Sequence, residues 1–543
     1  MRIIVLFLLL IMSIPILTKA HVGSPGVVLE GSAGPYKLVV SINPPDVIPG
    51  VAEVSIYTFD PEIDHVMAKP IYWGYGDEGS PKADEIPPSK ESAGMYEGIV
   101  WLMDRGTASI EVSVKGEKGL GSCVVPIMAQ ATAQNEMSPG LGWILSGLGL
   151  LLVILIITII GFAMSDAITS PSDDNKNLGR QRRKGWVIGG LFMIVLLTGG
   201  NAWWEYEASL YNQFMYKPPK AKVWATDVGG YRKMIFQIDS MSLKDRDRLP
   251  MEYLVPDHGK LMHMFMIKEG SLDVFAHLHP RRTDPLTFEV NLPNVPKGRY
   301  LVFGDIVRLN GFVETVFDTL EIKVDKKTHD ITNWRNDPDD TFIISTPFNG
   351  YEADEISSNV LICGKPGIET PLLDGSKAYF EHRPNQSFRV GKVYPLTFAF
   401  NDPDGKPALL EPYMGMMGHA VVFRKEGGVF VHLHPVGNYS MASQQIIETR
   451  INENSSRPKI PEIQVFYDSI NQVVNHIAAM SEEERNELLT EGMEHLGSGI
   501  HEEHGSTVTF PYAFPQEGNY RIWIQMKRAG QIMNSSFDAK VTL

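Results

Sequence analysis

A four-residue histidine motif occurs twice in this 543-residue chain and restricts how the sequence around it can fold. His-Leu-His-Pro occupies residues 277–280 and again residues 432–435. In a strand, residues two apart point to the same side of the sheet, so each copy presents two imidazoles next to each other. A further histidine precedes each copy, His263 before the first and His419 before the second.

Each motif ends a segment with the pattern of a β-hairpin, in which two apolar runs are separated by a turn rich in Lys, Glu and Gly. Folding the segments at these turns predicts that His263 lies opposite His277 and that His419 lies opposite His432. Opposed residues of an antiparallel pair share one face of the sheet. The sequence therefore predicts two clusters of three imidazoles, and imidazole is the commonest protein metal ligand near neutral pH.

Alignment of the two copies shows that they differ. His258 lies five residues before His263, and the corresponding position of the second copy is Met414. Thioether and imidazole together favour copper, particularly Cu(I), whereas imidazoles alone suit Cu(II) or zinc. We therefore expect copper, with zinc as the alternative. The expected ligands are His258, His263, His277 and His279 in the first copy, and His419, His432, His434, Met414, Met416 and Met417 in the second.

The same histidines have a second interpretation, as sheet residues that pack or hydrogen-bond, because the strands around them are apolar on both faces. The chain has only two cysteines, which excludes a disulfide framework, a CxxC zinc site and a thiolate blue-copper site. A three-histidine enzyme centre is a third reading. No carboxylate occupies the same position in both copies as a general base, so we do not expect an enzyme.

Three apolar segments indicate secretion and membrane insertion. Residues 1–20 have the charged start, apolar centre and small-residue end of a signal peptide, with an uncleaved anchor as the alternative. Residues 141–164 and 185–204 carry no charge and suit transmembrane helices. Residues 165–184 between them are rich in Lys and Arg, which marks the cytoplasmic side. Both large flanking regions are thus expected outside the cytoplasm.

Removal of the signal peptide would make His21 the first residue of the mature chain. An N-terminal histidine can bind copper through its α-amine and its ring, and His65 is the other histidine before the membrane segments. We name His21 and His65 as a further candidate copper site. The alternative is that the cleavage site precedes a histidine by chance.

Strand-like runs separated by turns rich in Pro and Gly predict a mainly β chain with three extracytoplasmic β-sandwich units and a transmembrane helical hairpin. The units are predicted at residues 21–130, 221–324 and 376–543. The third repeats the second and is interrupted by a helical insertion at residues 440–506. Residues 325–375 are polar and are predicted to be a linker.

Two stretches resemble known families. A β-sandwich that begins with His-Val-Gly-Ser-Pro at residues 21–25 resembles the CopC-like periplasmic copper-binding domains. Leu-Met-His-Met-Phe-Met-Ile at 261–267 and Phe-Ala-His-Leu-His-Pro at 275–280 resemble the YtkA/FixH-like extracytoplasmic domains of bacterial membrane proteins. These resemblances imply immunoglobulin-like sandwiches, a bacterial plasma membrane location and copper handling.

The net charge of −15 argues against nucleic acid as a partner. We expect a membrane-anchored protein, held in the lipid bilayer by two helices, that captures, buffers or delivers copper at the extracytoplasmic (periplasmic) face. An oxidase or a copper exporter in the same membrane is the expected protein partner. The main alternative is an interaction module of a membrane complex that binds no metal.

Overall fold

The computed structural model describes residues 26–60, 63–90, 92–166, 177–228, 230–243, 248–324, 334–335, 337–348, 360–362, 365–372, 374–383, 386–453, 455, 457–494 and 505–543. The predicted signal peptide and His21 lie outside these residues. The chain divides into two compact units, one of Met1–Gln130 with Lys217–Leu543 and one of Ala131–Tyr216. The first unit is mainly β and the second is helical.

The first β region contains two four-stranded sheets. Along β3, Ala52, Val54 and Ile56 alternate with more exposed residues and are at most 1% exposed, which is the period-two pattern of a strand with one buried face. The sheet orders are β1-β2-β3-β6 and β5-β4-β7-β8. The strands are β1 (Val27–Ala33), β2 (Tyr36–Asn43), β3 (Gly50–Thr58), β4 (Ile63–Tyr72), β5 (Asp84–Glu85), β6 (Met95–Leu102), β7 (Gly106–Gly116) and β8 (Gly119–Ala129).

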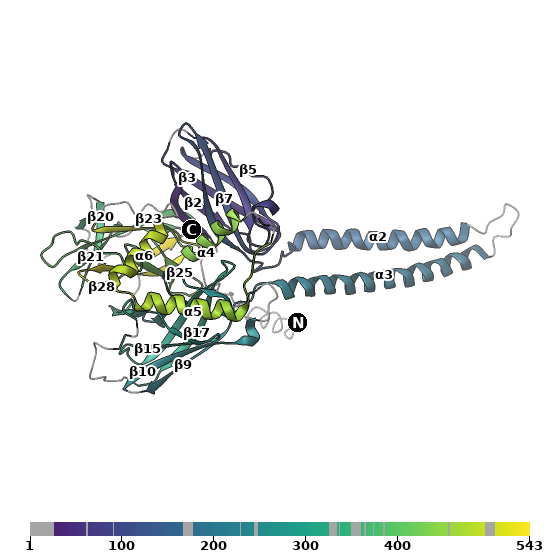
Figure 1. Ribbon diagram of the computed structural model, residues 1–543. Coiled ribbons are helices and arrows are strands. Elements are labelled where there is room, and N and C mark those ends of the chain that lie inside the picture. Colours follow the sequence, from purple (N-terminus) through teal and green to yellow (C-terminus); the bar gives the residue numbers. More distant parts are fainter. Residues whose placement is uncertain are drawn as a thin grey trace. The chain divides into compact units, whose positions relative to one another are not determined.

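The helical unit consists of α2 (Pro139–Asp166) and α3 (Leu178–Phe214), which lie side by side (Figure 1). Both helices are long and apolar enough to cross a membrane. Small residues let them approach closely, because a Cβ placed on Gly185 would lie 2.8 Å from the Cα of Gly161. The two predicted apolar helices are confirmed, although α3 extends beyond the expected residues 185–204 at both ends.

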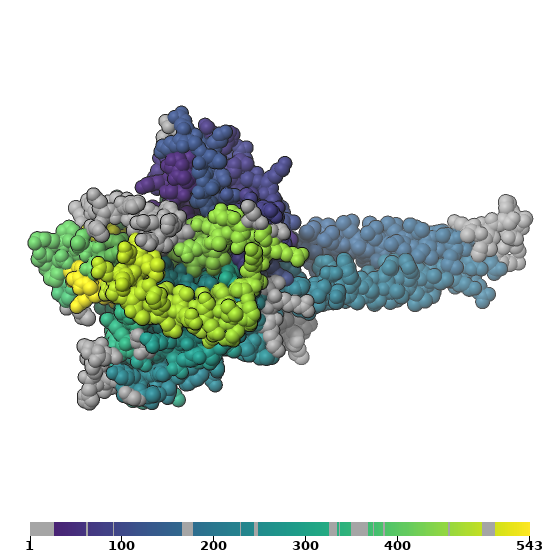
Figure 2. All heavy atoms as spheres, in the orientation of Figure 1, coloured from purple at the N-terminus to yellow at the C-terminus, as the bar shows by residue number. Residues whose placement is uncertain are grey.

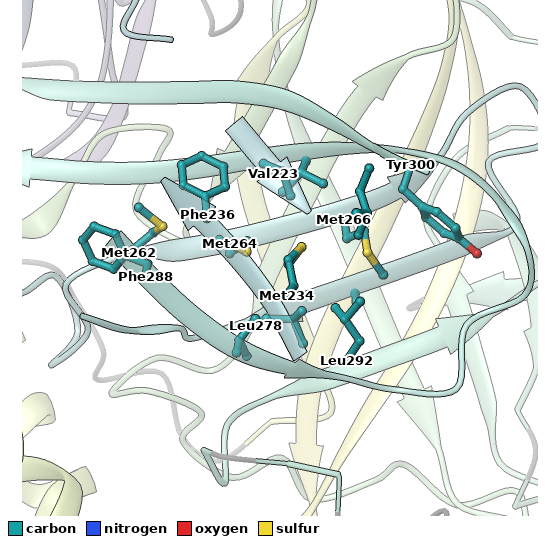
Figure 3. Packing of buried hydrophobic residues seen from close by; sticks show 14 of the residues in the cluster. Val223, Met234, Phe236, Met262, Met264, Met266, Leu278, Phe288, Leu292 and Tyr300 are labelled. Atoms are coloured by element: carbon teal, nitrogen blue, oxygen red, sulfur yellow. The ribbon is translucent and has the colours of Figure 1, made fainter. Parts of the chain in front are cut away.

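The second β region places two sheets around a methionine-rich core. Figure 3 shows Met234 and Met264 in the middle of this core, with Phe236 and Phe288 on the left and Met266 near Tyr300 on the right. One sheet has the order β14-β15-β10-β9 and the other β11-β16-β12-β13-β18, with β17 paired to β16. The strands are β9 (Ala221–Val228), β10 (Tyr231–Ile238), β11 (Leu254–Val255), β12 (His263–Lys268), β13 (Val274–Leu278), β14 (Arg281–Asp284), β15 (Thr287–Leu292), β16 (Gly298–Arg308), β17 (Val313–Ile322) and β18 (Thr341–Ile344).

The segment that was predicted to be a linker contributes to this sheet. Strand β18 pairs with β13, with Thr341 opposite His277 and Phe342 opposite Ala276. The second β region therefore extends past residue 324, and the predicted boundary is wrong. The residues before β18 are polar and gave no sign of the short strand, which forms the edge of the sheet beside the histidine motif.

The third β region repeats this arrangement. Its sheet orders are β19-β20-β21-β23-β26 and β22-β28-β27-β24-β25. The strands are β19 (Val360–Ile362), β20 (Lys365–Pro371), β21 (Lys377–Phe380), β22 (Phe388–Arg389), β23 (Val393–Asn401), β24 (His419–Arg424), β25 (Phe430–Leu433), β26 (Thr507–Ala513), β27 (Gly518–Arg528) and β28 (Gln531–Thr542).

The predicted helical insertion between β25 and β26 is confirmed as α4 (Met441–Asn452), α5 (Ile463–Ala479) and α6 (Glu482–Glu494). Helix α6 begins with a capping box, in which the Glu484 N–H donates to Ser481 Oγ and the Ser481 N–H donates to Glu484 Oε2. Figure 2 shows the light-green atoms of this insertion on the surface of the face in view.

The sheets that carry the histidine motifs pack against each other with approximate two-fold symmetry. Strands β16, β12 and β13 of the second region correspond to β27, β24 and β25 of the third. Phe303 of β16 stacks on Phe430 of β25 with ring centroids 4.0 Å apart. At the equivalent place, Trp523 of β27 stacks on Phe275 of β13 at 4.9 Å. The two copies of the motif are therefore brought face to face.

The register of both hairpins differs from the prediction by two residues. His277 is opposite Phe265, and His432 is opposite Val421. The first turn is longer than expected, because the Leu272 N–H donates to the Lys268 carbonyl and closes a wider loop. A shift of two residues leaves every side chain on the same face of the sheet. The predicted pairing is wrong, but the histidines still share one face.

Candidate metal centre

Seven histidines meet where the two sheets face each other. The two predicted clusters form a single group, since the His432 ring lies 5.4 Å from that of His263 and 5.6 Å from that of His277, measured between centroids. Six of the seven are at most 7% exposed, and His432 is partly exposed. The group consists of His258, His263, His277, His279, His419, His432 and His434.

Three of these residues, His263, His277 and His279, form what we call triad A. One ring nitrogen from each lies within 4.8 Å of the other two. The second nitrogen of each ring faces an oxygen acceptor: His263 Nε2 the Asp257 carbonyl at 3.1 Å, His277 Nδ1 Gln525 Oε1 at 2.8 Å, and His279 Nδ1 Asp340 Oδ1 at 3.1 Å. These acceptors place the proton on the outer nitrogen of each ring, which leaves the inner nitrogens as lone pairs.

With the protons on the outer nitrogens, the inner nitrogens of His263 and His277 face each other as lone pairs. His263 Nδ1 and His277 Nε2 are 3.1 Å apart. Burial lowers the pKa of both rings well below 6.5, with the neighbouring histidines adding to the effect, so a second proton is disfavoured at neutral pH. Two lone pairs at this distance repel unless a cation lies between them. Hydrogen bonds that fix the tautomer from outside are the usual support of a metal-binding imidazole.

His258, His419 and His434 form a second group, triad B, whose ligand nitrogens also lie within 4.8 Å of one another. His434 Nδ1 donates to the Tyr439 carbonyl at 3.0 Å, and the His258 ring bonds the backbone of Met414. Among the described residues, His258 Nε2, His434 Nε2 and both nitrogens of His419 are buried without a hydrogen-bond partner. Burying an unsatisfied polar atom costs about 1–3 kcal/mol, so four together need an explanation.

Triad B combines residues from two β regions. His258 precedes β12 of the second region, whereas His419 and His434 belong to the hairpin of the third. The ring centroid of His258 lies 5.5 Å from that of His419 and 4.9 Å from that of His434. His258 was predicted to join the histidines of its own copy, and it also lies 6.0 Å from His263. The structure thus places it in triad B, close to triad A.

Matching tight turns position His258 and Met414. Asp257 and Lys260 pair across the first turn, as Tyr413 and Met416 pair across the second. The central residues have φ of 50° and 78° at His258 and Gly259, and of 53° and 80° at Met414 and Gly415. Positive φ at both central positions is the two-residue turn that Asn-Gly and Gly-Gly usually form. A histidine or methionine there is uncommon, and such strain is concentrated at functional sites.

Burial disfavours the charged form of the triad B rings and of His432 at neutral pH. The pKa of His434 is lowered to about 4, mainly by burial and in part by the neighbouring His258, while Asp257 opposes the change. Burial likewise lowers the pKa of His419 and His432 well below the ordinary value, and the adjacent rings contribute. Neutral imidazole is the form that binds metals, so protons do not compete for these nitrogens near pH 7.

Two supporting side chains were not predicted. Asp340, which is 0% exposed, holds His279, and it lies in the segment that was read as a linker. Gln525 holds His277 from the third region and is itself fixed by Asn534, whose Oδ1 accepts from Gln525 Nε2 at 3.1 Å. The run Asp337 to Asp340 directly before a strand was the one available signal. Nothing in the sequence near Gln525 indicates its role.

The helical insertion covers the two turns. A Cβ placed on Gly415 would lie 2.9 Å from Leu489 Cβ of α6, and one on Gly259 would lie 3.1 Å from Ile477 Cγ2 of α5. An ion pair joins α6 to the segment before β18, with Arg485 Nη2 3.4 Å from Asp339 Oδ1. Helices α5 and α6 therefore lie over the histidines on the side where the two turns meet.

Other predicted ligands lie elsewhere. Met417 packs against the hydrophobic core of the third region. His65 is on an exposed part of β4, where its Nδ1 is 3.0 Å from Glu85 Oε1. His21 lies outside the described residues, so the proposed pairing of His21 with His65 stays a prediction. Met416 is buried beside Met414 in the second turn.

Comparison with known proteins gives a match to one family, described as "Domain of unknown function (DUF8832)", over residues 228–324 and 374–457. Each matched segment contains one copy of the His-Leu-His-Pro motif. No curated protein matches the chain significantly.

Solved structures show only remote similarity. Latent PorU from Porphyromonas gingivalis is 6% identical, with a TM-score of 0.14 over 95% of this chain, and the chain spans only 34% of its length. A putative membrane anchored protein from Corynebacterium diphtheriae is 8% identical, with a TM-score of 0.13 over 95% of this chain and 94% of its own.

Proposed function

We propose that this protein binds copper at the extracytoplasmic face of a membrane, holding one ion in triad A and one in triad B. Its role would be to capture, buffer or deliver copper. The observation that supports this most strongly is the set of inner imidazole nitrogens. In triad A they converge within 4.8 Å of one another while the outer nitrogens face oxygen acceptors, and in triad B they are buried without hydrogen-bond partners. A cation in each triad would bind one nitrogen from each of its three rings.

The charge balance favours Cu(I) over a divalent ion. The imidazoles themselves are neutral, and one buried carboxylate lies beside each triad, Asp340 at His279 and Asp257 at His258, so each site can offset a single positive charge. The cost of burying charge rises steeply with its magnitude. A monovalent ion therefore suits these triads better than Zn²⁺ or Cu²⁺. Zinc is the alternative that the binding experiment has to exclude.

Storage or transfer fits this centre better than catalysis. Six of the seven rings are at most 7% exposed, and α5 and α6 lie over the turns that carry Met414 and His258. A metalloenzyme would need an open coordination position within reach of a substrate. For the same reason, delivery to a partner such as an oxidase or an exporter would require the insertion to move.

The membrane assignment rests on α2 and α3, which we propose as two transmembrane helices. Arg180, Arg182, Arg183 and Lys184 lie at the start of α3, which favours the cytoplasmic side for that end. The β regions, as immunoglobulin-like units, would then all lie outside the cytoplasm. Labelling of single cysteines at Ser138 and Arg180 in intact cells tests this: only the first should react with an impermeant thiol reagent, and the reverse pattern would contradict it.

Metal content of the full chain in detergent tests the binding proposal. The protein is loaded with Cu(I), Cu(II) or Zn(II), separated from free metal and measured by mass spectrometry. Two Cu(I) per chain are expected, falling to one in His279→Gln and to one in His434→Gln. His65→Gln, at an exposed position outside the centre, is the matched control. Equal, weak binding in all four proteins would overturn the proposal. Tighter binding of zinc than of copper would show that zinc, not copper, is the metal.

A further inference from the structure

We infer that Met414 supplies a thioether ligand to triad A, so that the two sites differ chemically. The inference rests on the proposed function and adds a residue to it. Sequence alignment had grouped Met414 with the histidines of its own copy, the second one. The symmetry of the structure assigns it to triad A, which is built from the histidines of the first copy.

The argument starts from the equivalence of the two turns. His258 and Met414 occupy the same turn position with φ of 50° and 53°. Each is followed by a glycine of positive φ and enclosed by the same backbone pairing. Equal backbone conformations direct their Cα–Cβ bonds in equivalent directions. His258 points from the second β region to His434 of the third, at 4.9 Å between ring centroids.

The approximate two-fold relation then indicates which residues lie in the direction of the Met414 Cα–Cβ bond. This axis exchanges His263 with His419 and His279 with His434, as the register of the strands shows. The counterpart of a contact from His258 to His434 is a contact from Met414 to His279. The Phe303–Phe430 and Trp523–Phe275 stacks show that the symmetry holds in the packing itself.

By the same correspondence between the two copies, the neighbouring Met416 and Met417 point away from the triads. Met416 corresponds to Lys260, whose side chain points away from the histidines and forms an ion pair with Asp337, with Nζ 2.6 Å from Oδ1. Met417 corresponds to Leu261, and both pack in the hydrophobic cores of their own regions. Of the three predicted thioethers, Met414 is therefore the one that the symmetry directs towards a triad.

The surroundings of Met414 agree with this assignment. Its side chain is 1% exposed, yet it is a member neither of the two β-region cores nor of the aromatic cluster between them. The His258 ring bonds its backbone, which places the residue at the junction of the triads. With this thioether, triad A offers three nitrogens and one sulfur, a set that selects Cu(I). Triad B offers imidazoles only.

X-ray absorption of the full chain loaded with two Cu(I) tests the inference. One sulfur ligand shared over two copper ions is expected in the wild-type spectrum, and it should disappear in Met414→Leu. The Cu(I) affinity of one site should fall about tenfold or more in that variant. Even the loss of a residue that only supports a metal ligand typically lowers metal affinity by about tenfold. Met416→Leu and Met417→Leu are the matched controls and should keep both sulfur signal and affinity.

Met414→Leu conserves side-chain volume, so little change in the unfolding temperature is expected. The wild-type spectrum gives an answer even if the variant is unstable. Two bound Cu(I) without any sulfur ligand, or a sulfur signal lost in Met416→Leu instead, would overturn the role of Met414 and leave the proposed function standing. A wild-type chain that binds no copper would overturn both.

Discussion

The ring of His258 lies 4.9 Å from that of His434, although the two residues belong to different β regions. Triad B therefore cannot form within either region alone. An ion bound there, as we propose, would join the second region to the third, in addition to the aromatic packing of Phe303 and Trp523. Metal binding and the association of the two regions are thus expected to be coupled.

Replacing His258 tests this coupling. In His258→Asn, a residue type that tolerates positive φ, one Cu(I) should be lost although His419 and His434 remain. A ligand at 100 times its Kd stabilises the folded state by about 2.7 kcal/mol. Copper should therefore raise the free energy of unfolding of the variant by that much less than it raises that of the wild type. Thermal unfolding with and without Cu(I) measures it. Two retained ions would show that triad B does not need His258.

The cover over the turns can be tested with two glycines. Gly415→Ala places a methyl 2.9 Å from Leu489 Cβ at φ of 80°, whereas Gly270→Ala meets nothing within 4 Å at φ of 81°. In both variants the free energy of unfolding should fall by about 1–2 kcal/mol, because alanine is disfavoured in the left-handed backbone conformation. Only Gly415→Ala should also displace α6 and speed the transfer of Cu(I) to a chelator. Equal transfer rates in the two variants would argue against a covering role.

Acid stability should depend on Asp337. Burial alone would raise the pKa of this carboxyl, but the Lys260 ammonium outweighs it and lowers the pKa to about 2. An unfolded Asp titrates near about 3.9, so the unfolded chain binds more protons between these values. The contribution, on the order of 2 kcal/mol, is present above about pH 4 and is lost as the pH falls towards 2.

Urea unfolding of the copper-free protein at several pH values measures this contribution. Asp337→Asn should be less stable than wild type at pH 6, because it leaves Lys260 with one carboxylate fewer. Its stability should also fall less steeply below pH 4. Parallel curves for the two proteins would contradict the assignment.

Packing of the two apolar helices should depend on Gly185. A side chain there would meet the Cα of Gly161 at 2.8 Å, whereas Gly190 has open space. Gly185→Leu should therefore separate α2 from α3, and Gly190→Leu should not. Disulfide formation between cysteines placed at Ile157 and Gly189, in a chain lacking its own two cysteines, reports the contact. Equal cross-linking in both variants would count against close packing at Gly185.

Part of the centre was predictable from the sequence because strand periodicity is robust. The spacing of His277 and His279 placed both on one face, and a register error of two residues could not change that. The register itself depended on how the turn closes at Leu272, which glycine content does not specify. The helices of the insertion were predictable from their spacing and from the Ser481–Glu484 capping box.

The joining of the two clusters was not predictable, because it depends on how two sheets pack. Gln525 is far from the motif that it supports, and nothing in its local sequence separates it from any other strand residue. Asp340 was misread because its polar neighbours resemble a linker. Met417 was taken for a ligand because it follows Met414, but its position in the repeat is that of a core residue.

The presence of both repeats on one polypeptide has a consequence for the matching turns. Two identical one-unit chains related by a true two-fold axis could build the same paired centre, but every substitution would then appear on both sides. Covalent linkage of the repeats removes that restriction. One turn is free to carry histidine while its counterpart carries methionine, so two neighbouring clusters within a single molecule can differ in their side chains.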